Sequence, residues 1–170
     1  AEAHLTRAKN LAVQLGDRRL WVESIVLFGK SLQLRGEAST AHTHLLPAIE
    51  AARALKDPGL LMLALRVHGN LLLDLERHQA AEEAIRESLA LAEQLKATEA
   101  IAACLNSLGA IAEQRREYER ALEYFRQALD LAIQIGNAFA EAALSANLAH
   151  LLYELKPDQP EVRIYAERGL

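Results

Sequence analysis

The stretch that decides the fold is residues 97–136, which read ATEAIAACLNSLGAIAEQRREYERALEYFRQALDLAIQIG. Apolar and small residues recur in it at spacings of three and four, the spacing of one face of an α-helix. A polar turn at Arg116–Glu117 separates two such periodic segments. The stretch therefore predicts two helices that are joined as a hairpin.

The same pattern returns every forty residues along the chain. One set of turn signals marks the start of each unit: Gly16–Asp17, Asp57–Pro58, Lys96–Ala97 and Gly136–Asn137. A second set lies halfway between them, at Gly36, Arg77, Arg116–Glu117 and Lys156–Pro157. A fixed period of this length is the signature of a helical repeat protein, in which each unit stacks on the next.

Aligned on this period, several positions keep their residue type. The recurrent columns are Gly29, Gly69, Gly109 and Ala149; Ala1, Ala41, Ala81 and Ala121; Leu5, Leu45, Ile85, Phe125 and Tyr165; Ala8, Ala48, Ser88 and Ala128; and Ala12, Ala52, Ala92 and Ala132. Glycine inside a helix costs about 1 kcal/mol relative to Ala, so three glycines in register need a reason. We expect a neighbouring helix to leave no room for a Cβ atom there.

This pattern resembles the tetratricopeptide repeat family, whose signature is W-x2-L-G-x2-Y…A-x3-F…P. The third copy matches the signature at Leu108, Gly109, Ala121 and Phe125. It departs from it at Leu105, Ala112 and Ile133, which stand where the family has Trp, Tyr and Pro. The resemblance extends over the whole chain and is weakest in the last twelve or so residues.

The resemblance implies an all-α fold, a right-handed solenoid of antiparallel helix hairpins. We expect a single solenoid over residues 1–170, in which residues 1–16 are the second helix of a truncated repeat. Full repeats follow at 17–56, 57–96 and 97–136, and a partial repeat at 137–170. Because the chain begins without Met and neither end has a polar capping face, we expect it to be a fragment of a longer protein.

Two exposed apolar ends would favour end-to-end self-association of such a fragment. The apolar residues expected there are Leu5, Leu11 and Leu15 at the front, with Ile164 and Leu170 at the back.

Composition narrows the class of partner. The chain carries 19 basic and 23 acidic residues, a formal net charge of −4, and has no basic stripe of the kind that nucleic-acid binding requires. No apolar run is long enough to span a bilayer, and the chain does not open on a signal peptide. The single cysteine, Cys104, cannot form an internal disulfide, which fits a reducing compartment. We expect a cytoplasmic protein with no direct nucleic-acid or membrane contact, and the family resemblance implies that it is bacterial.

Motifs that suggest chemistry have simpler explanations in the repeat. Gly29-Lys30-Ser31 resembles the end of a phosphate-binding loop, but it lies within a helix and lacks the preceding glycine. His42 and His44 are two residues apart, whereas a metal pair on a helix is spaced four apart. His68 falls in the column of Phe28, which predicts a packed side chain. We therefore expect no catalytic residue, no metal site and no cofactor.

In tetratricopeptide repeats the first helix of each hairpin lines the concave surface. On this chain the resemblance places six polar residues in the groove: Lys30, Arg66, Asn70, Asn106, Asn147 and His150. A row of side-chain amides can hold an extended peptide backbone, and the two cations would attract an acidic group. The alternative is that these groups solvate an exposed face or bond neighbouring helices.

The function that follows is a protein-protein interaction module, which binds a peptide or a partner protein in the concave groove. An alternative is a sensor or regulatory segment of a multidomain bacterial transcriptional or signalling regulator, whose long Ala/Leu/Arg-rich repeats this sequence resembles. An enzyme would need convergent ionisable groups in a pocket, and the repeat predicts none.

Overall fold

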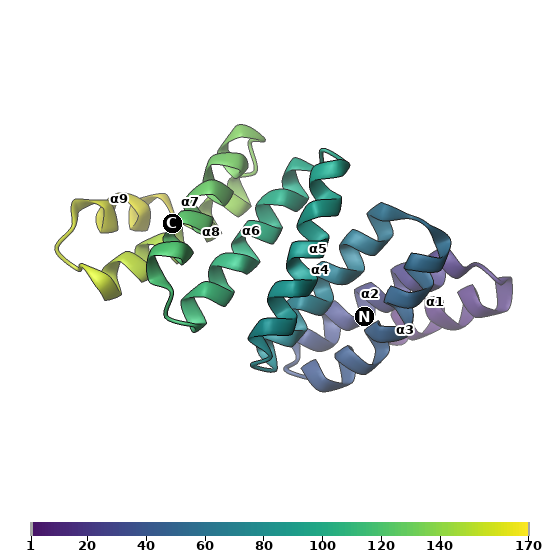
Figure 1. The fold of residues 1–170 in the computed structure, drawn as a ribbon. Coiled ribbons are helices and arrows are strands. Elements are labelled where there is room, and N and C mark those ends of the chain that lie inside the picture. The colour runs from purple at the N-terminus through teal and green to yellow at the C-terminus, as the bar shows by residue number, and fades with distance from the viewer. Residues whose placement is uncertain (1, 170) are drawn as a thin grey trace. The chain divides into compact units, whose positions relative to one another are not determined.

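The structure, a computed structural model, describes residues 2–169, with the side chains of residues 2–5, 8 and 9 outside the description. The expected contributions of Ala1, Leu5, Ala8 and Leu170 therefore lie outside the described residues. The described part of the chain contains nine α-helices and no strand (Figure 1). They are α1 (Glu2–Leu15), α2 (Arg18–Leu34), α3 (Ala38–Leu55), α4 (Pro58–Asp74), α5 (His78–Gln94), α6 (Thr98–Gln114), α7 (Tyr118–Gln134), α8 (Ala138–Leu155) and α9 (Pro160–Arg168).

The first helices of three repeats begin at side-chain caps. The Oδ1 atoms of Asp17, Asp57 and Asn137 accept hydrogen bonds from backbone N–H groups three residues ahead, at 2.9, 3.0 and 3.0 Å. Each of these bonds satisfies one of the N–H groups that a helix start leaves without a partner. The caps recur at the expected forty-residue spacing and fix where α2, α4 and α8 begin.

Helix ends recur every twenty residues. A residue with positive φ follows seven successive helices: Gly16, Gly36, Lys56, Glu76, Lys96, Arg116 and Gly136. At the end of α2, the Gly36 N–H donates to the Gln33 carbonyl at 2.9 Å and the Glu37 N–H donates to the Leu32 carbonyl at 3.0 Å. Such paired bonds close a helix and turn the chain into the next one. The turns predicted from the sequence are confirmed.

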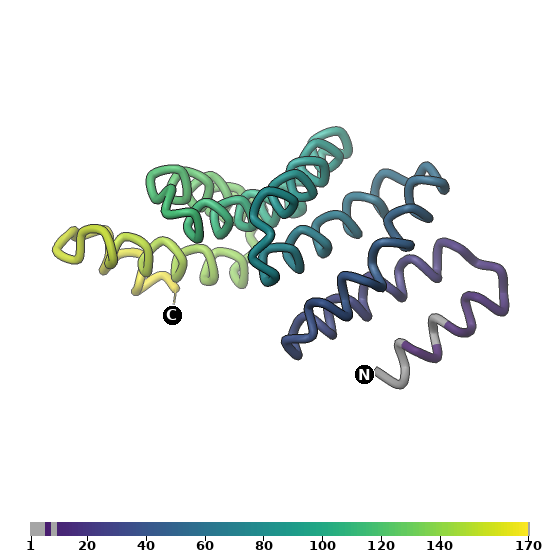
Figure 2. Tube along the Cα trace, turned by 60° about the horizontal axis from the view of Figure 1, so that its bottom comes forward, coloured from purple at the N-terminus to yellow at the C-terminus, as the bar shows by residue number. Residues whose placement is uncertain are grey.

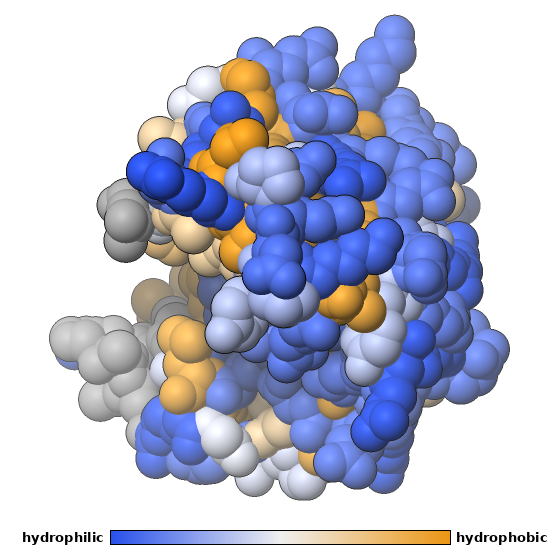
Figure 3. Space-filling view, turned by 90° about the vertical axis from the view of Figure 1, so that its left-hand side faces the viewer, coloured by the Kyte–Doolittle hydropathy of each residue, from blue (hydrophilic) through white to orange (hydrophobic). Residues whose placement is uncertain are grey.

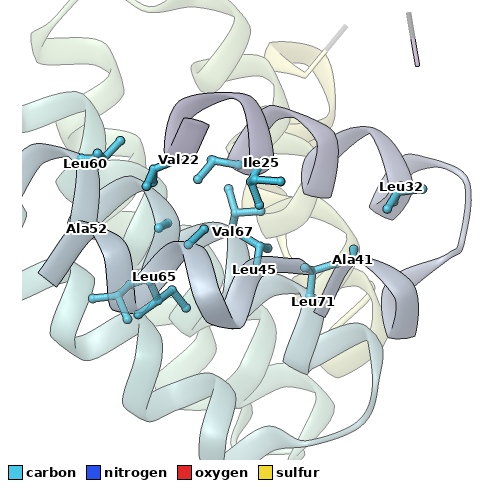
Figure 4. Packing of buried hydrophobic residues seen from close by; sticks show 14 of the residues in the cluster. Val22, Ile25, Leu32, Ala41, Leu45, Ala52, Leu60, Leu65, Val67 and Leu71 are labelled. Carbon is cyan, nitrogen blue, oxygen red and sulfur yellow. The ribbon is translucent and has the colours of Figure 1, made fainter. Parts of the chain in front are cut away.

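The chain divides into two compact units, Ala1–Leu95 and Lys96–Leu170. In the N-terminal unit α2 packs against α3, α3 against α4, and α4 against α5, with α2 and α4 also in contact. Its core is a cluster of buried aliphatic side chains that includes Val22, Ile25, Leu45, Leu65 and Leu71 (Figure 4). In the C-terminal unit α6 packs against α7, α7 against α8, and α8 against α9. Successive helices reverse direction in hairpins (Figure 2), so the predicted all-α fold is confirmed, while the single solenoid over 1–170 stays a prediction.

The glycine column is explained by close helix contacts within the hairpins. A Cβ atom at Gly109 would lie 2.5 Å from the Cε1 atom of Phe125, and one at Gly69 would lie 2.6 Å from the Cδ1 atom of Ile85. At Gly29 the nearest atom would be Leu45 Cδ1 at 2.9 Å. Each glycine thus admits the large side chain that stands sixteen residues later in the next helix. The close contact predicted from the sequence is confirmed.

Candidate peptide-binding face

In the N-terminal unit, α2 and α4 lie side by side and carry three of the predicted site residues. The Gln33 Nε2 atom donates to Asp74 Oδ2 at 2.7 Å, which joins the ends of the two helices. Lys30 is exposed on α2, while Arg66 and Asn70 are partly exposed on α4. Arg66 and Asn70 are four residues apart and therefore share one side of α4.

Two exposed leucines lie next to Lys30 on α2. Leu27 is 55% exposed and Leu34 is 83% exposed. Residues 27, 30 and 34 are spaced three and four apart, so they form one stripe along the helix. Neither leucine was among the groove residues that the sequence predicted. The predicted basic site of this unit thus has an apolar border.

In the C-terminal unit, Asn106 and Asn147 are brought together. The Asn147 Nδ2 atom on α8 donates to Asn106 Oδ1 on α6 at 3.0 Å. The two amides therefore bond neighbouring helices, which was the alternative to peptide contact. One bond leaves each amide with further donors and acceptors, since an amide group offers two N–H donors and a carbonyl oxygen with two lone pairs. Asn70 belongs to the other unit and takes no part in this pair.

His150 lies on the same side of α8 and faces two carboxylates. Its Nδ1 atom is 3.5 Å from Glu113 Oε1 on α6, and its Nε2 atom is 3.7 Å from Glu154 Oε1 one turn along α8. The side chain is 64% exposed. His150, Asn106 and Asn147 thus form one polar surface over α6 and α8. We call this surface, together with Glu113 and the exposed residues of α8 beside it, the α6–α8 face.

Two aromatic residues of this face were missed by the sequence reasoning. Phe139 is 86% exposed and Tyr153 is 62% exposed, both on α8. Residues 139, 146, 150 and 153 follow the seven, four and three spacing of one helix stripe, and all four are exposed. The sequence could have predicted both residues, because His150 had already been assigned to the groove and they lie on the same helix stripe. Exposed apolar residues appear in orange on an otherwise hydrophilic surface when the molecule is viewed from the side of α9 (Figure 3).

Two histidines of the N-terminal unit, His42 and His68, are packed against each other. The His68 Nε2 and His42 Nδ1 atoms are 2.9 Å apart, and the two rings are nearly parallel, at 9°, with centroids 4.9 Å apart. Burial and the neighbouring His42 lower the pKa of His68 to about 4. Burial and the charge of Arg77 also lower the pKa of His42. Two neutral rings can share one N–H···N bond, so the pair joins α3 to α4 as a packing contact.

The other sequence motifs are also accounted for by packing. His44 makes an edge-to-face contact with Phe28, with ring centroids 5.5 Å apart. Gly29 of the Gly29-Lys30-Ser31 segment lies within α2 against Leu45, and Cys104 is fully buried in α6. Among the described residues, no three His, Cys, Asp or Glu side chains come together as metal ligands do.

A separate pocket of about 340 Å³ opens in the N-terminal unit among α1, α2 and α3. Its wall is largely apolar, with Trp21 on α2 and Ala51 on α3. The column of Ala51 holds leucine in the other copies, at Leu11, Leu91 and Leu131. The pocket therefore lies where a smaller residue replaces a leucine, a replacement that the sequence shows but that was not among the columns used to predict the site.

Part of the sequence matches a known protein family. Residues 59–134 match the family model of the tetratricopeptide repeat. No protein of curated function matches the sequence. Within the described residues, no helix is both long enough and apolar enough to cross a membrane.

Solved structures share the fold over nearly the whole chain. BtubC from P. vanneervenii is similar with a TM-score of 0.82 and 24% identity, over 99% of this chain and 70% of that one. Aspartyl phosphate phosphatase F from Bacillus subtilis has a TM-score of 0.84 and 16% identity, over 97% of this chain and 43% of its own. A Rap protein in complex with competence and sporulation factor has a TM-score of 0.81 and 19% identity, over 96% and 45%. The chain thus spans less than half the length of the last two proteins. The match to the tetratricopeptide repeat family thus covers residues 59–134, and the solved structures extend the shared fold over nearly the whole chain.

Proposed function

We propose that this chain is a protein-interaction module that binds an extended peptide of a partner protein on the face made by the first helices of its hairpins. The observation that carries the proposal is the Asn106–Asn147 pair, in which two amides of neighbouring first helices lie 3.0 Å apart with hydrogen-bonding capacity left over. An extended peptide offers N–H and C=O groups to such amides whatever its side chains are.

The N-terminal unit supports the same function with different groups. Lys30, Arg66 and Asn70 make no side-chain hydrogen bond or ion pair with any residue that the structure describes. Unpaired cations beside a free amide suit an acidic group of the partner. On this proposal the six residues named from the sequence are the contact residues, and the protein is a binding module without catalytic residues.

A second candidate is a sensor or regulatory segment of a larger bacterial signalling protein. The similarity in fold to a Rap protein that was crystallised with competence and sporulation factor favours it, since that protein holds a factor on a fold of this kind. The two candidates share the peptide-binding face and differ in what binding controls.

The test uses peptides selected from a random 12-residue library on the full 170-residue chain. The variant carries Asn70→Ala, Asn106→Ala and Asn147→Ala. The control carries Asn10→Ala, Gln94→Ala and Gln134→Ala, which remove three exposed amides from second helices. Each lost hydrogen bond is worth about 0.5–1.5 kcal/mol, so we expect the first variant to weaken binding at least about tenfold in total and the control to leave it unchanged.

Circular dichroism establishes that both triple variants remain helical. If the folded first variant binds the selected peptides as tightly as the control does, the first-helix face is not the binding site. If no peptide is selected at all, the proposal of peptide binding fails as a whole.

A further inference from the structure

The charged side chains within the bounds of the two first helices of the C-terminal unit, α6 and α8, are all negative. Helices α6 and α8 contain four carboxylates and no Lys or Arg: Glu99, Glu113, Glu141 and Glu154. Basic residues follow only at their C-caps, Arg115 and Lys156. Helices α2 and α4 of the N-terminal unit contain four cations, Arg18, Arg19, Lys30 and Arg66, and two carboxylates, Glu23 and Asp74. The first helices of the two units therefore differ in the sign of their net charge, which is positive in the N-terminal unit and negative in the C-terminal unit.

Not all of the four carboxylates are open to a partner. The Oε1 atom of Glu141 lies 3.7 Å from the Nε atom of Arg168 on α9. Glu113 and Glu154 face only His150 among the described residues, and their side chains are 29% and 53% exposed. Glu99, in the first turn of α6, is also exposed. Glu113 and Glu154 are the two carboxylates that lie beside His150 and that a cationic partner can reach.

The apolar groups of this face lie on the same stripe of α8. Phe139 and Tyr153, at 86% and 62% exposure, stand at opposite ends of the helix with His150 between them. Fourteen residues of α-helix span about 21 Å, at a rise of 1.5 Å per residue. An extended peptide covers this length with about six residues, at roughly 3.3 Å each. Two apolar side chains of a bound peptide would reach both rings at that separation.

We propose that the α6–α8 face binds an extended, positively charged peptide segment that carries two apolar side chains about six residues apart. The inference rests on the proposed function and specifies the chemistry of its partner. Phe139 and Tyr153 hold the apolar side chains, Asn106 and Asn147 bond the backbone between them, and Glu113 and Glu154 pair with Lys or Arg of the peptide. The negative charge of the face favours a peptide with net positive charge, and the distance between the two rings sets the spacing of the peptide's apolar side chains.

The experiment starts from the same random 12-residue library, selected on the full chain, and compares two variants that change the face. One carries Phe139→Ala and Tyr153→Ala, and the other carries Glu113→Gln and Glu154→Gln. Matched controls change the second helix α7 of the same unit: Ile133→Ala removes a side chain that is 44% exposed, and the pair Glu119→Gln and Asp130→Asn removes two exposed carboxylates.

We expect the selected peptides to carry net positive charge, with two apolar residues five to seven positions apart. The aromatic variant should weaken their binding at least about tenfold, as loss of an aromatic anchor does. The carboxylate variant should weaken it about five- to tenfold at low ionic strength, with the difference fading as salt is added. Both controls should bind as the unchanged chain does.

The outcomes separate this inference from the function on which it rests. Selected peptides that are acidic, and that lose binding on Lys30→Ala and Arg66→Ala, would overturn the inference and leave the proposed function standing. Peptides whose binding responds to neither set of changes, nor to loss of the three asparagines, would remove both. Self-association that is seen by analytical ultracentrifugation and abolished by Phe139→Ala would assign the aromatic stripe to a second copy of the chain and overturn the inference.

Discussion

The two hairpins of the C-terminal unit, α6–α7 and α8–α9, follow one forty-residue template but are packed very differently. In the first, α7 buries Ala121, Phe125, Ala128, Leu129 and Ala132. In the second, no described residue of α9 is buried, and α9 is nine residues long against seventeen for α7. The template positions decide where helices lie, while the residues placed on them decide how tightly the helices are held.

Substitution at the large apolar column should show the largest difference between the hairpins. Phe125 is completely buried, and Phe125→Ala should lower the free energy of unfolding by about 3–5 kcal/mol. Tyr165 occupies the same column on α9 but is only half-buried, so Tyr165→Ala should cost less than about 1 kcal/mol. Urea denaturation followed by circular dichroism measures both, and equal losses would show that the hairpins are packed alike.

The glycine column should show the next largest difference. A Cβ atom at Gly109 would lie 2.5 Å from Phe125 Cε1, so Gly109→Ala must displace the ring and should cost about 1–3 kcal/mol. The second hairpin already has alanine at this position, Ala149, and there Ala149→Gly should cost about 1 kcal/mol through helix propensity alone. The same denaturation experiment checks both. A stabilising Gly109→Ala would mean that helix propensity, and not the aromatic contact, governs the column.

The sequence predicted the fold well because the fold repeats. Each cap, turn and close contact appears three or four times, so a weak local signal such as Gly109 is supported by Gly29 and Gly69. The candidate site does not repeat in this way. Asn106 and Asn147 are paired by a contact between two helices, and Phe139 is exposed because nothing among the described residues covers it. Which polar groups bond one another, and which apolar groups stay exposed, depends on neighbours that the period of the sequence does not describe.

A buried serine on α8 should account for a smaller difference in stability between the two hairpins. Ser145 on α8 is completely buried, and its Oγ atom has no hydrogen-bond partner among the described residues. The same column holds Leu105 on α6. Because a buried hydroxyl without a partner is destabilising, Ser145→Ala should raise the free energy of unfolding by about 1 kcal/mol.

Ser107 provides the control for this change. It is also buried on a first helix of the unit, but its Oγ atom donates to the Ala103 carbonyl at 3.1 Å. Ser107→Ala should therefore leave stability unchanged or lower it slightly. Equal effects of the two substitutions in thermal unfolding would show that the Ser145 hydroxyl is satisfied in solution.

The turns of the two hairpins should differ by the smallest amount. Between α6 and α7 the chain turns at Arg116 with a φ of 62°, in the left-handed region, whereas between α8 and α9 Lys156 has a φ of −152°. A residue with a Cβ atom is strained at the first turn and relaxed at the second. Arg116→Gly should therefore stabilise the unit by about 0.5–1 kcal/mol, since the relief exceeds the added entropy of the unfolded chain. Lys156→Gly gains no such relief and should destabilise it by about 0.5 kcal/mol.

Arg116→Ala is the control, because it removes the same charge but keeps the strained Cβ, and it should not stabilise. Thermal unfolding of the three variants measures the sign of each effect. If Arg116→Ala stabilised the unit as much as Arg116→Gly, the gain would come from the lost charge and the left-handed turn would not be the cause.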